Sequence, residues 1–140
     1  MDLVTRKVTM DGGAPLRSYL NRIAADLGDG PAALEDTLLP AVRDALAVLK
    51  RSSALVRADV SADATGAAAA NYLRLFAITS LGWMWVRIAR AALNQADAIR
   101  QRHLALANFY ANHVLPQASA LEVAIAAGPE PILALDPKML

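Results

Sequence analysis

The sequence predicts an all-α fold, arranged as an up-and-down bundle of three to four long antiparallel helices. Alanine and leucine, which favour helices, outnumber valine, isoleucine and the aromatic residues, which favour strands, more than twofold. Apolar side chains recur every three or four residues along most of the chain, which is the spacing of one helix face. The intervening segments are short and rich in glycine, proline and aspartate, so successive helices are expected to fold back on one another.

Residues 1–13 are expected to form a lead-in, because Asp11-Gly12-Gly13 is typical of a turn. The first helix is predicted over 14–27. Pro15 lies in its first turn, where proline is favourable, and Gly28 occupies the position at which a glycine commonly ends a helix.

The second helix is predicted over about 31–58, after the turn Asp29-Gly30-Pro31. Glu35 and Asp36 lie early in it, where the helix macrodipole favours negative charge. Pro40 interrupts the apolar pattern, so we expect it to kink this helix or to split off its first turns.

The third helix is predicted over 64–93, after a connection in which Ser61 or Asp63 acts as the N-cap. Its middle, 75–86, is apolar on every side, which indicates that neighbouring elements cover it all round. Gly82 lies within this stretch and allows another helix to approach closely.

A short turn then makes the fourth helix, predicted over 97–127, an antiparallel neighbour of the third. Pro116 is expected to kink it, and Gly128 to end it. Residues 129–140 are expected to form a C-terminal tail with at most one helical turn, so the predicted bundle occupies 14–128.

Composition excludes several classes of function. The chain has 14 Lys and Arg against 13 Asp and Glu, a balance too even for a nucleic-acid-binding surface. It has no cysteine, which excludes disulfides, thiolate metal sites and cysteine nucleophiles. The longest uncharged apolar run, 75–86, is far shorter than the roughly 20 residues of a membrane span. No signal peptide follows Met1, so we expect a cytoplasmic protein without a membrane span.

No catalytic, cofactor-binding or metal-binding residue is predicted in this chain. His103 and His113 lie about 15 Å apart along one helix and cannot share a metal, so we expect them to be surface or hydrogen-bonded structural residues. The serines at 52–53 are expected to bond the preceding turn of their own helix. Five carboxylates are poor candidates for a catalytic base. Glu35 and Asp36 are explained by a helix start, Asp59 and Asp63 by a connection, and Glu122 has no charged neighbour within one turn.

Trp83 and Trp85 point in directions about 160° apart on the third predicted helix. We expect Trp83 to lie in the core and the opposite side, around Leu81, Met84, Trp85 and Ile88, to contact another domain or subunit. A hydrophobic fraction of 56% exceeds the usual 45–50% and supports such a contact, so a homo-oligomer is expected.

Several segments resemble the C-terminal region of large acyl-CoA dehydrogenases, specifically the 3-methylmercaptopropionyl-CoA dehydrogenase type with its extra C-terminal helical domain. They are YLRLF at 72–76, GWMW at 82–85, FYA at 109–111 and HVLP at 113–116. At the other end, DLV at 2–4, RK at 6–7 and DGGA at 11–14 resemble the segment that joins the catalytic domain to this helical domain.

The resemblance implies a parent enzyme that uses FAD to remove hydrogens from the α and β carbons of an acyl-CoA, with a glutamate in a Tyr-Glu-Gly-Thr stretch as the base. That stretch is absent here, because Tyr19, Tyr72 and Tyr110 are followed by Leu, Leu and Ala. No catalytic or flavin-binding residue of the family can therefore be placed on this sequence, and the chain is expected to be the C-terminal piece of such an enzyme.

Two hypotheses of function follow. The first is a non-catalytic structural and interaction domain of a FAD-dependent acyl-CoA dehydrogenase, whose partners are the catalytic domain of the same protein, a neighbouring subunit, or both. The second is a stand-alone helical-bundle module that binds another protein. Neither involves a nucleic acid, and neither assigns a cofactor to this chain itself.

Overall fold

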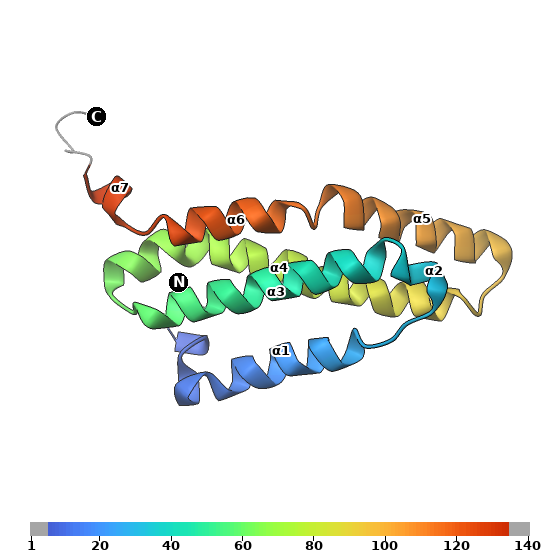
Figure 1. Cartoon of the computed structure of the whole chain (residues 1–140), viewed down its shortest axis with the longest axis horizontal. Coiled ribbons are helices and arrows are strands. Elements are labelled where there is room, and N and C mark those ends of the chain that lie inside the picture. Colours follow the sequence, from blue (N-terminus) through green and yellow to red (C-terminus); the bar gives the residue numbers. More distant parts are fainter. Residues whose placement is uncertain (1–5, 135–140) are drawn as a thin grey trace.

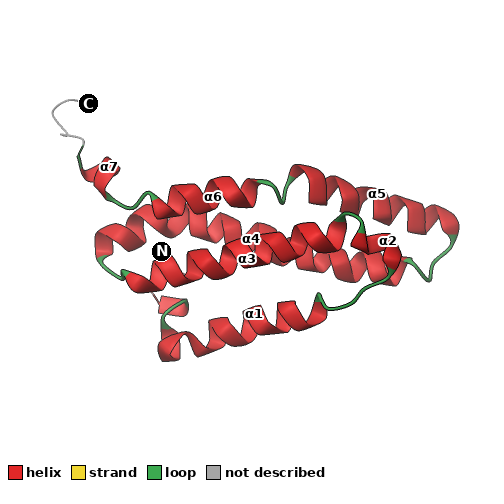
Figure 2. Cartoon of the chain, viewed as in Figure 1, coloured by secondary structure: helices red, strands yellow, loops and turns green. Residues whose placement is uncertain are grey.

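The computed structural model describes residues 6–134, and all regular secondary structure in that range is helical (Figure 2). The all-α prediction is therefore confirmed. In chain order the elements are the short 3-10 helix η2 (Met10–Gly13), α1 (Ala14–Asp26), α2 (Ala32–Glu35), α3 (Leu38–Ala58), α4 (Ala62–Ala92), α5 (Asp97–His113), α6 (Gln117–Ala126) and α7 (Glu130–Leu133).

The long helices lie side by side along the long axis of the molecule (Figure 1). Helix α4 packs against α3, α5 and α6, and α3 in turn packs against α1, α5 and α6. Helices α5 and α6 follow one another along the same edge, whereas α1 lies along the opposite edge. The core is formed by the inward faces of these helices.

The separate helices are more numerous than the three to four expected, because two predicted helices are each divided. The element expected over 31–58 is broken at 36–37, which separates α2 from α3. Pro40 then occupies the third position of α3, where its missing N–H leaves no helical hydrogen bond unmade. The element expected over 97–127 is broken at 114–116, which separates α5 from α6.

The break between α5 and α6 positions the side chain of Leu115 in the core. Leu115 is buried in the break and reaches Gly82 of α4, where a Cβ would lie 3.0 Å from the Leu115 Cδ2 atom. The same Cβ would lie 3.3 Å from Cγ2 of Val42 on α3. The predicted close approach at Gly82 is thus confirmed, and the chain interruption at Pro116 supplies the side chain that fills it.

Helix α4 begins and ends close to the predicted 64–93, with Ser61 as its N-cap: the Ser61 hydroxyl accepts a hydrogen bond from the Ala64 amide at 3.3 Å. The expectation that it is covered on every side is wrong. One side is buried, but Leu73, Leu81 and Ile88 are 55%, 53% and 41% exposed. An apolar composition all round the helix therefore has two causes, a core on one side and an uncovered apolar surface on the other.

Some polar groups within the core find partners across helices, whereas the buried Thr79 hydroxyl has none among residues 6–134. The Trp83 indole N–H donates to Asp26 Oδ2 of α1 at 2.6 Å, and Trp83 is only 6% exposed, as predicted. Ser53 donates to the Leu49 carbonyl of its own helix at 2.6 Å, as expected. For Ser52 the same expectation is wrong, because its buried hydroxyl has no hydrogen-bond partner in the described part of the chain. The Ser53 hydroxyl also lies 2.8 Å from the Tyr72 hydroxyl. Burial raises the pKa of this tyrosine.

Both ends of the described chain adjoin the helices. Val8, within the expected lead-in, is 1% exposed and belongs to the core. Gly12 and Gly13 adopt the left-handed backbone (φ 61° and 78°), and the Gly12 carbonyl accepts hydrogen bonds from Arg17 and Arg57 at 2.5 and 2.6 Å. The single turn expected after residue 128 is α7, whereas 1–5 and 135–140 lie outside the described residues.

Replacing Trp83 with alanine should lower the free energy of unfolding by about 3–5 kcal/mol, because a buried indole is lost and Asp26 loses its donor. Urea unfolding followed by circular dichroism measures this effect. Phe109→Ala is the matched control, since Phe109 is 59% exposed and its loss should cost less than about 0.5 kcal/mol. Equal losses in the two variants would contradict the burial described here.

Candidate interaction surface

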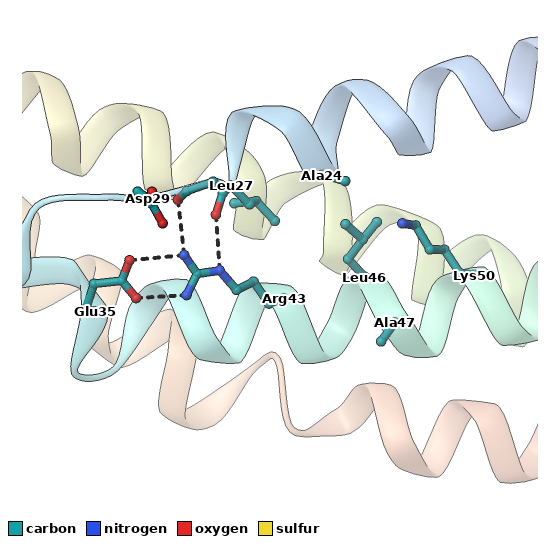
Figure 3. Close-up of a pocket in the computed structure, with 9 residues that line it drawn as sticks. Ala24, Leu27, Asp29, Glu35, Arg43, Leu46, Ala47 and Lys50 are labelled. Atoms are coloured by element: carbon teal, nitrogen blue, oxygen red, sulfur yellow. Dashed lines mark hydrogen bonds and ion pairs between the residues drawn. The ribbon is translucent and has the colours of Figure 1, made fainter.

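A hollow of about 650 Å³ lies between α1 and α3 (Figure 3). One end of it is closed by Arg43, which makes a two-point ion pair with Glu35 at 2.8 and 3.0 Å. Arg43 also donates to the carbonyls of Leu27 and Gly28, at 3.1 and 3.0 Å, and so caps the C-terminus of α1. Its guanidinium is thus engaged in joining α1, α2 and α3 rather than directed toward a ligand.

Glu35 is the carboxylate partner in the ion pair with Arg43. Its carboxylate accepts a hydrogen bond from the Gly30 amide at 3.2 Å, and the Arg43 guanidinium holds the pKa of this carboxyl below its ordinary value. The sequence explained Glu35 by its place early in a helix. In the structure it instead ends the short α2, and its main role is to bind Arg43.

Glu122 has a partner that sequence spacing does not reveal. Arg51 on α3 binds it through two hydrogen bonds of 2.7 and 2.9 Å, across 71 positions of the chain. The guanidinium lowers the pKa of the Glu122 carboxyl. This pair joins α3 to α6 at a partly exposed position.

The two histidines occupy structural or surface positions, as expected. The Nδ1 atom of His103 lies 2.8 Å from the Ile99 carbonyl one turn earlier. His113 is exposed and its ring lies 4.6 Å from that of Phe109. Within residues 6–134, no three His, Asp or Glu side chains converge in a way that could hold a metal ion.

An extended uncovered apolar feature is a line of residues along α4, which we call the α4 stripe: Gly66, Ala70, Leu73, Ala77, Leu81, Met84 and Ile88. At about 100° per residue, all seven lie within an arc of about 80° centred on Ala77. Six of them are exposed and Met84 is half-buried. The stripe contains no charged or hydrogen-bonding side chain.

Trp85 is not part of the exposed contact surface that was predicted around it. It is half-buried, and its ring lies 6.3 Å from that of Tyr110 on α5. The Tyr110 hydroxyl donates to the Ile78 carbonyl at 2.9 Å. Trp85 therefore helps to join α4 to α5, and of the four residues expected at the contact, Leu81 and Ile88 are the exposed ones.

A second apolar area lies at the end of the molecule where α3 ends, α4 begins and α7 lies (Figure 1). We call it the end surface: Leu55, Val60, Ile132 and Leu133, which are 46%, 61%, 59% and 61% exposed. Two hollows of about 240 and 280 Å³ meet here and share Pro129 in their linings. The surface is thus indented, and its apolar side chains adjoin the acidic residues Asp59, Asp63 and Glu130, which also line the hollows.

The α4 stripe and the end surface are candidates for contact with another protein surface. Exposed apolar areas of this extent on a small domain are typical of contact sites. None of the described helices has the length and apolarity that a bilayer crossing requires. The carboxylates with the clearest partners, Glu35 and Glu122, are both bound to arginines.

Comparison with known proteins identifies the family. Residues 17–136 match the sequence model of the family described as "Acetyl-CoA dehydrogenase C-terminal like". Because this match covers most of the chain, the protein belongs to that family, which represents a C-terminal domain of acyl-CoA dehydrogenase-type proteins. A search of curated proteins finds no match. The resemblance is thereby confirmed at the level of the family, and the particular enzyme type stays a prediction.

The Arg51–Glu122 pair should make stability depend on pH. A glutamate whose pKa is lower in the folded than in the unfolded chain stabilises the fold above its unfolded pKa, and this contribution is lost as the pH falls through the folded value. Glu122→Gln should therefore reduce stability at pH 7 by about 0.3–1 kcal/mol and make no difference near pH 2–3. Thermal melts across this range test it, with Glu130→Gln on α7 as the control. A penalty for Glu122→Gln that persists undiminished at pH 2 would contradict the ion-pair explanation.

Proposed function

We propose that this chain is the non-catalytic C-terminal structural and interaction domain of a FAD-dependent acyl-CoA dehydrogenase of the 3-methylmercaptopropionyl-CoA type. The family match over 17–136 supports a place within a dehydrogenase-type protein. The two uncovered apolar areas, the α4 stripe and the end surface, support a role in contacts. The end surface is the single observation that carries the interaction role.

The residues of the chain are poorly suited to the chemistry of the parent. Abstraction of an α-proton needs a base with an accessible lone pair and a pKa near the working pH. Glu35 and Glu122 are each bound by an arginine that lowers the carboxyl pKa, which makes both weak bases. When bound, FAD supplies the acceptor for the hydride, and the residues of this chain would act by holding domains together.

The hollow between α1 and α3 also does not fit FAD. A flavin site is a largely apolar cleft with a few converging polar groups free to bind the cofactor. Here the lining holds two carboxylates, Asp29 and Glu35, against a single lysine, Lys50, so it would not attract a pyrophosphate. The Arg43 donors are already bound to Glu35 and two backbone carbonyls. We therefore assign no flavin contact to the described residues.

The end surface is the proposed contact with the catalytic domain. A C-terminal domain is joined to the preceding domain through its own first residues, and here η2 lies beside Arg57 near the C-terminus of α3 (Figure 1). The exposed Leu55 and Val60 lie at the same end of α3. A catalytic domain joined through this end can cover the apolar side chains there and bury them.

The test separates this role from catalysis by the chain itself. The purified chain, gel-filtered after incubation with FAD, should retain no stoichiometric flavin and should oxidise no acyl-CoA in the presence of an artificial electron acceptor. Added to the catalytic portion encoded upstream and expressed without it, the chain should co-elute with that portion and raise its melting temperature. Val60→Glu should weaken this binding at least tenfold, because a charge would be buried without a partner.

Gln101→Glu serves as the matched control, since it adds the same charge at an exposed position of α5, away from the end surface. Retained flavin with turnover would contradict the non-catalytic role. An upstream region without a dehydrogenase would favour the stand-alone binding module instead.

A further inference from the structure

We propose that the α4 stripe is the contact surface for a second copy of this chain, with the two α4 helices antiparallel and related by a two-fold axis at Ala77. This inference deepens the interaction role proposed above and rests on it. It gives the α4 stripe a different occupant from the end surface, which is assigned to the catalytic domain. The two surfaces adjoin at Gly66, which lines one hollow together with Ile132 and Leu133.

The stripe has the length and chemistry of a helix-pairing face. From Gly66 to Ile88 it runs for about 33 Å at 1.5 Å per residue. Its neighbours on either side already pack within the molecule: Tyr19 of α1 contacts Phe76, and Tyr110 of α5 contacts Trp85. A further helix can therefore approach only over the stripe itself.

The spacing of the stripe is symmetric about Ala77. Stripe residues lie 4, 7 and 11 positions before it, at Leu73, Ala70 and Gly66. Others lie 4, 7 and 11 positions after it, at Leu81, Met84 and Ile88. When two such helices run antiparallel with their Ala77 residues opposed, every stripe residue meets a stripe residue, and none meets a buried or charged position.

The sizes of the opposed residues are complementary. The antiparallel pairing sets Ile88 against Gly66, Met84 against Ala70, and Leu73 against Leu81, with small Ala77 at the axis. Large side chains facing small ones fill the space between helices evenly. A Cβ placed on Gly66 would meet no atom within 4 Å, so there is room above it for the Ile88 side chain of the other copy.

A parallel pair fits less well. It would set Ile88 against Ile88 at one end and Gly66 against Gly66 at the other, which forces the helices apart at one end and leaves a void at the other. It would also place the two Asp63 side chains near each other, whereas the antiparallel pair puts the Asp63 end of one helix beside the Arg87 end of its mate. Antiparallel macrodipoles likewise attract.

The size of the contact indicates how tightly the two copies should bind. A standard interface takes about 800 Å² and 20–30 residues from each partner, and seven stripe residues fall short of that number. We therefore expect a reversible dimer that forms as the chain concentration rises. Sedimentation velocity should show this as a concentration-dependent sedimentation coefficient.

Engineered cysteines test both the contact and its direction, since the natural chain has no cysteine. Ala77→Cys should form a disulfide-linked dimer rapidly under mild oxidation, because a residue at the axis lies next to its own copy. Leu73→Cys mixed with Leu81→Cys should give the mixed dimer at least tenfold faster than either variant links to itself. The reason is that residues eight positions apart are about 12 Å apart along the helix, beyond disulfide reach.

Two controls accompany this experiment. Ala54→Cys, exposed on α3 and off the stripe, should link slowly, at the rate of random collision. Adding Leu81→Glu to Ala77→Cys should slow linking at least tenfold while the circular dichroism spectrum stays helical, since Leu81 is exposed.

The outcomes are distinct. Fast self-linking of Leu73→Cys with slow mixed linking would overturn the antiparallel arrangement. Linking of Ala77→Cys no faster than of Ala54→Cys would overturn the second copy as the occupant. In either case, continued binding of the chain to the catalytic portion through the end surface would leave the proposed function intact.

Discussion

Helix α4 can lie among α1, α3, α5 and α6 only because small or apolar side chains surround most of its circumference. Gly82 gives Leu115 and Val42 space to meet at its surface, and Tyr72, Leu75 and Val86 are fully buried against its neighbours. A charged residue on this inner side would be buried without a partner, at a cost of several kcal/mol. The other helices take their positions from this central element.

The outer helices are fixed to this centre by specific polar links. Asp26 at the end of α1 accepts the Trp83 indole N–H, and the Asp26 carbonyl accepts a hydrogen bond from Arg90 at 2.6 Å. Arg43 of α3 closes the last turn of α1 from the other side. These bonds give α1 a defined position along α3 and α4, which apolar contact alone leaves free to slide.

Local chemistry explains how much of the fold the sequence predicts. The start of α4 at Ser61 and the end of α6 before Gly128 (φ 71°) follow from capping and glycine signals that act within a few residues. Gly28 does not adopt the left-handed backbone, and Arg43 caps that end of α1 instead. The separation of α2 from α3 was foreseen as one of two effects of Pro40, although the break at 36–37 lies before the proline. The break at 114–116 was foreseen only as a kink at Pro116. Whether a proline kinks a helix or ends it depends on tertiary contacts, such as the burial of Leu115 against Gly82.

The candidate site shows the limits of sequence spacing more clearly. Arg51 and Glu122 are 71 positions apart, so no local pattern could pair them. An apolar stretch reads alike whether a core or a partner covers it, which is why the coverage of α4 was overestimated. The expectation of an exposed contact around Leu81 and Ile88 nevertheless agrees with their exposure. Trp85 is half-buried instead, because it packs against Tyr110 of α5, and the residues next to Trp85 in the sequence do not reveal that contact.

The central claim is that α4 is the element on which the rest of the structure depends, with a core on one side and a contact face on the other. Native-state amide hydrogen exchange tests it most directly. The account predicts that the slowest amides lie in α4 between Tyr72 and Val86 and that they exchange only through global unfolding, while amides of α1 and α7 exchange through local opening. Slowest exchange in α1 or α5, with local opening of α4 at lower free energy, would contradict it.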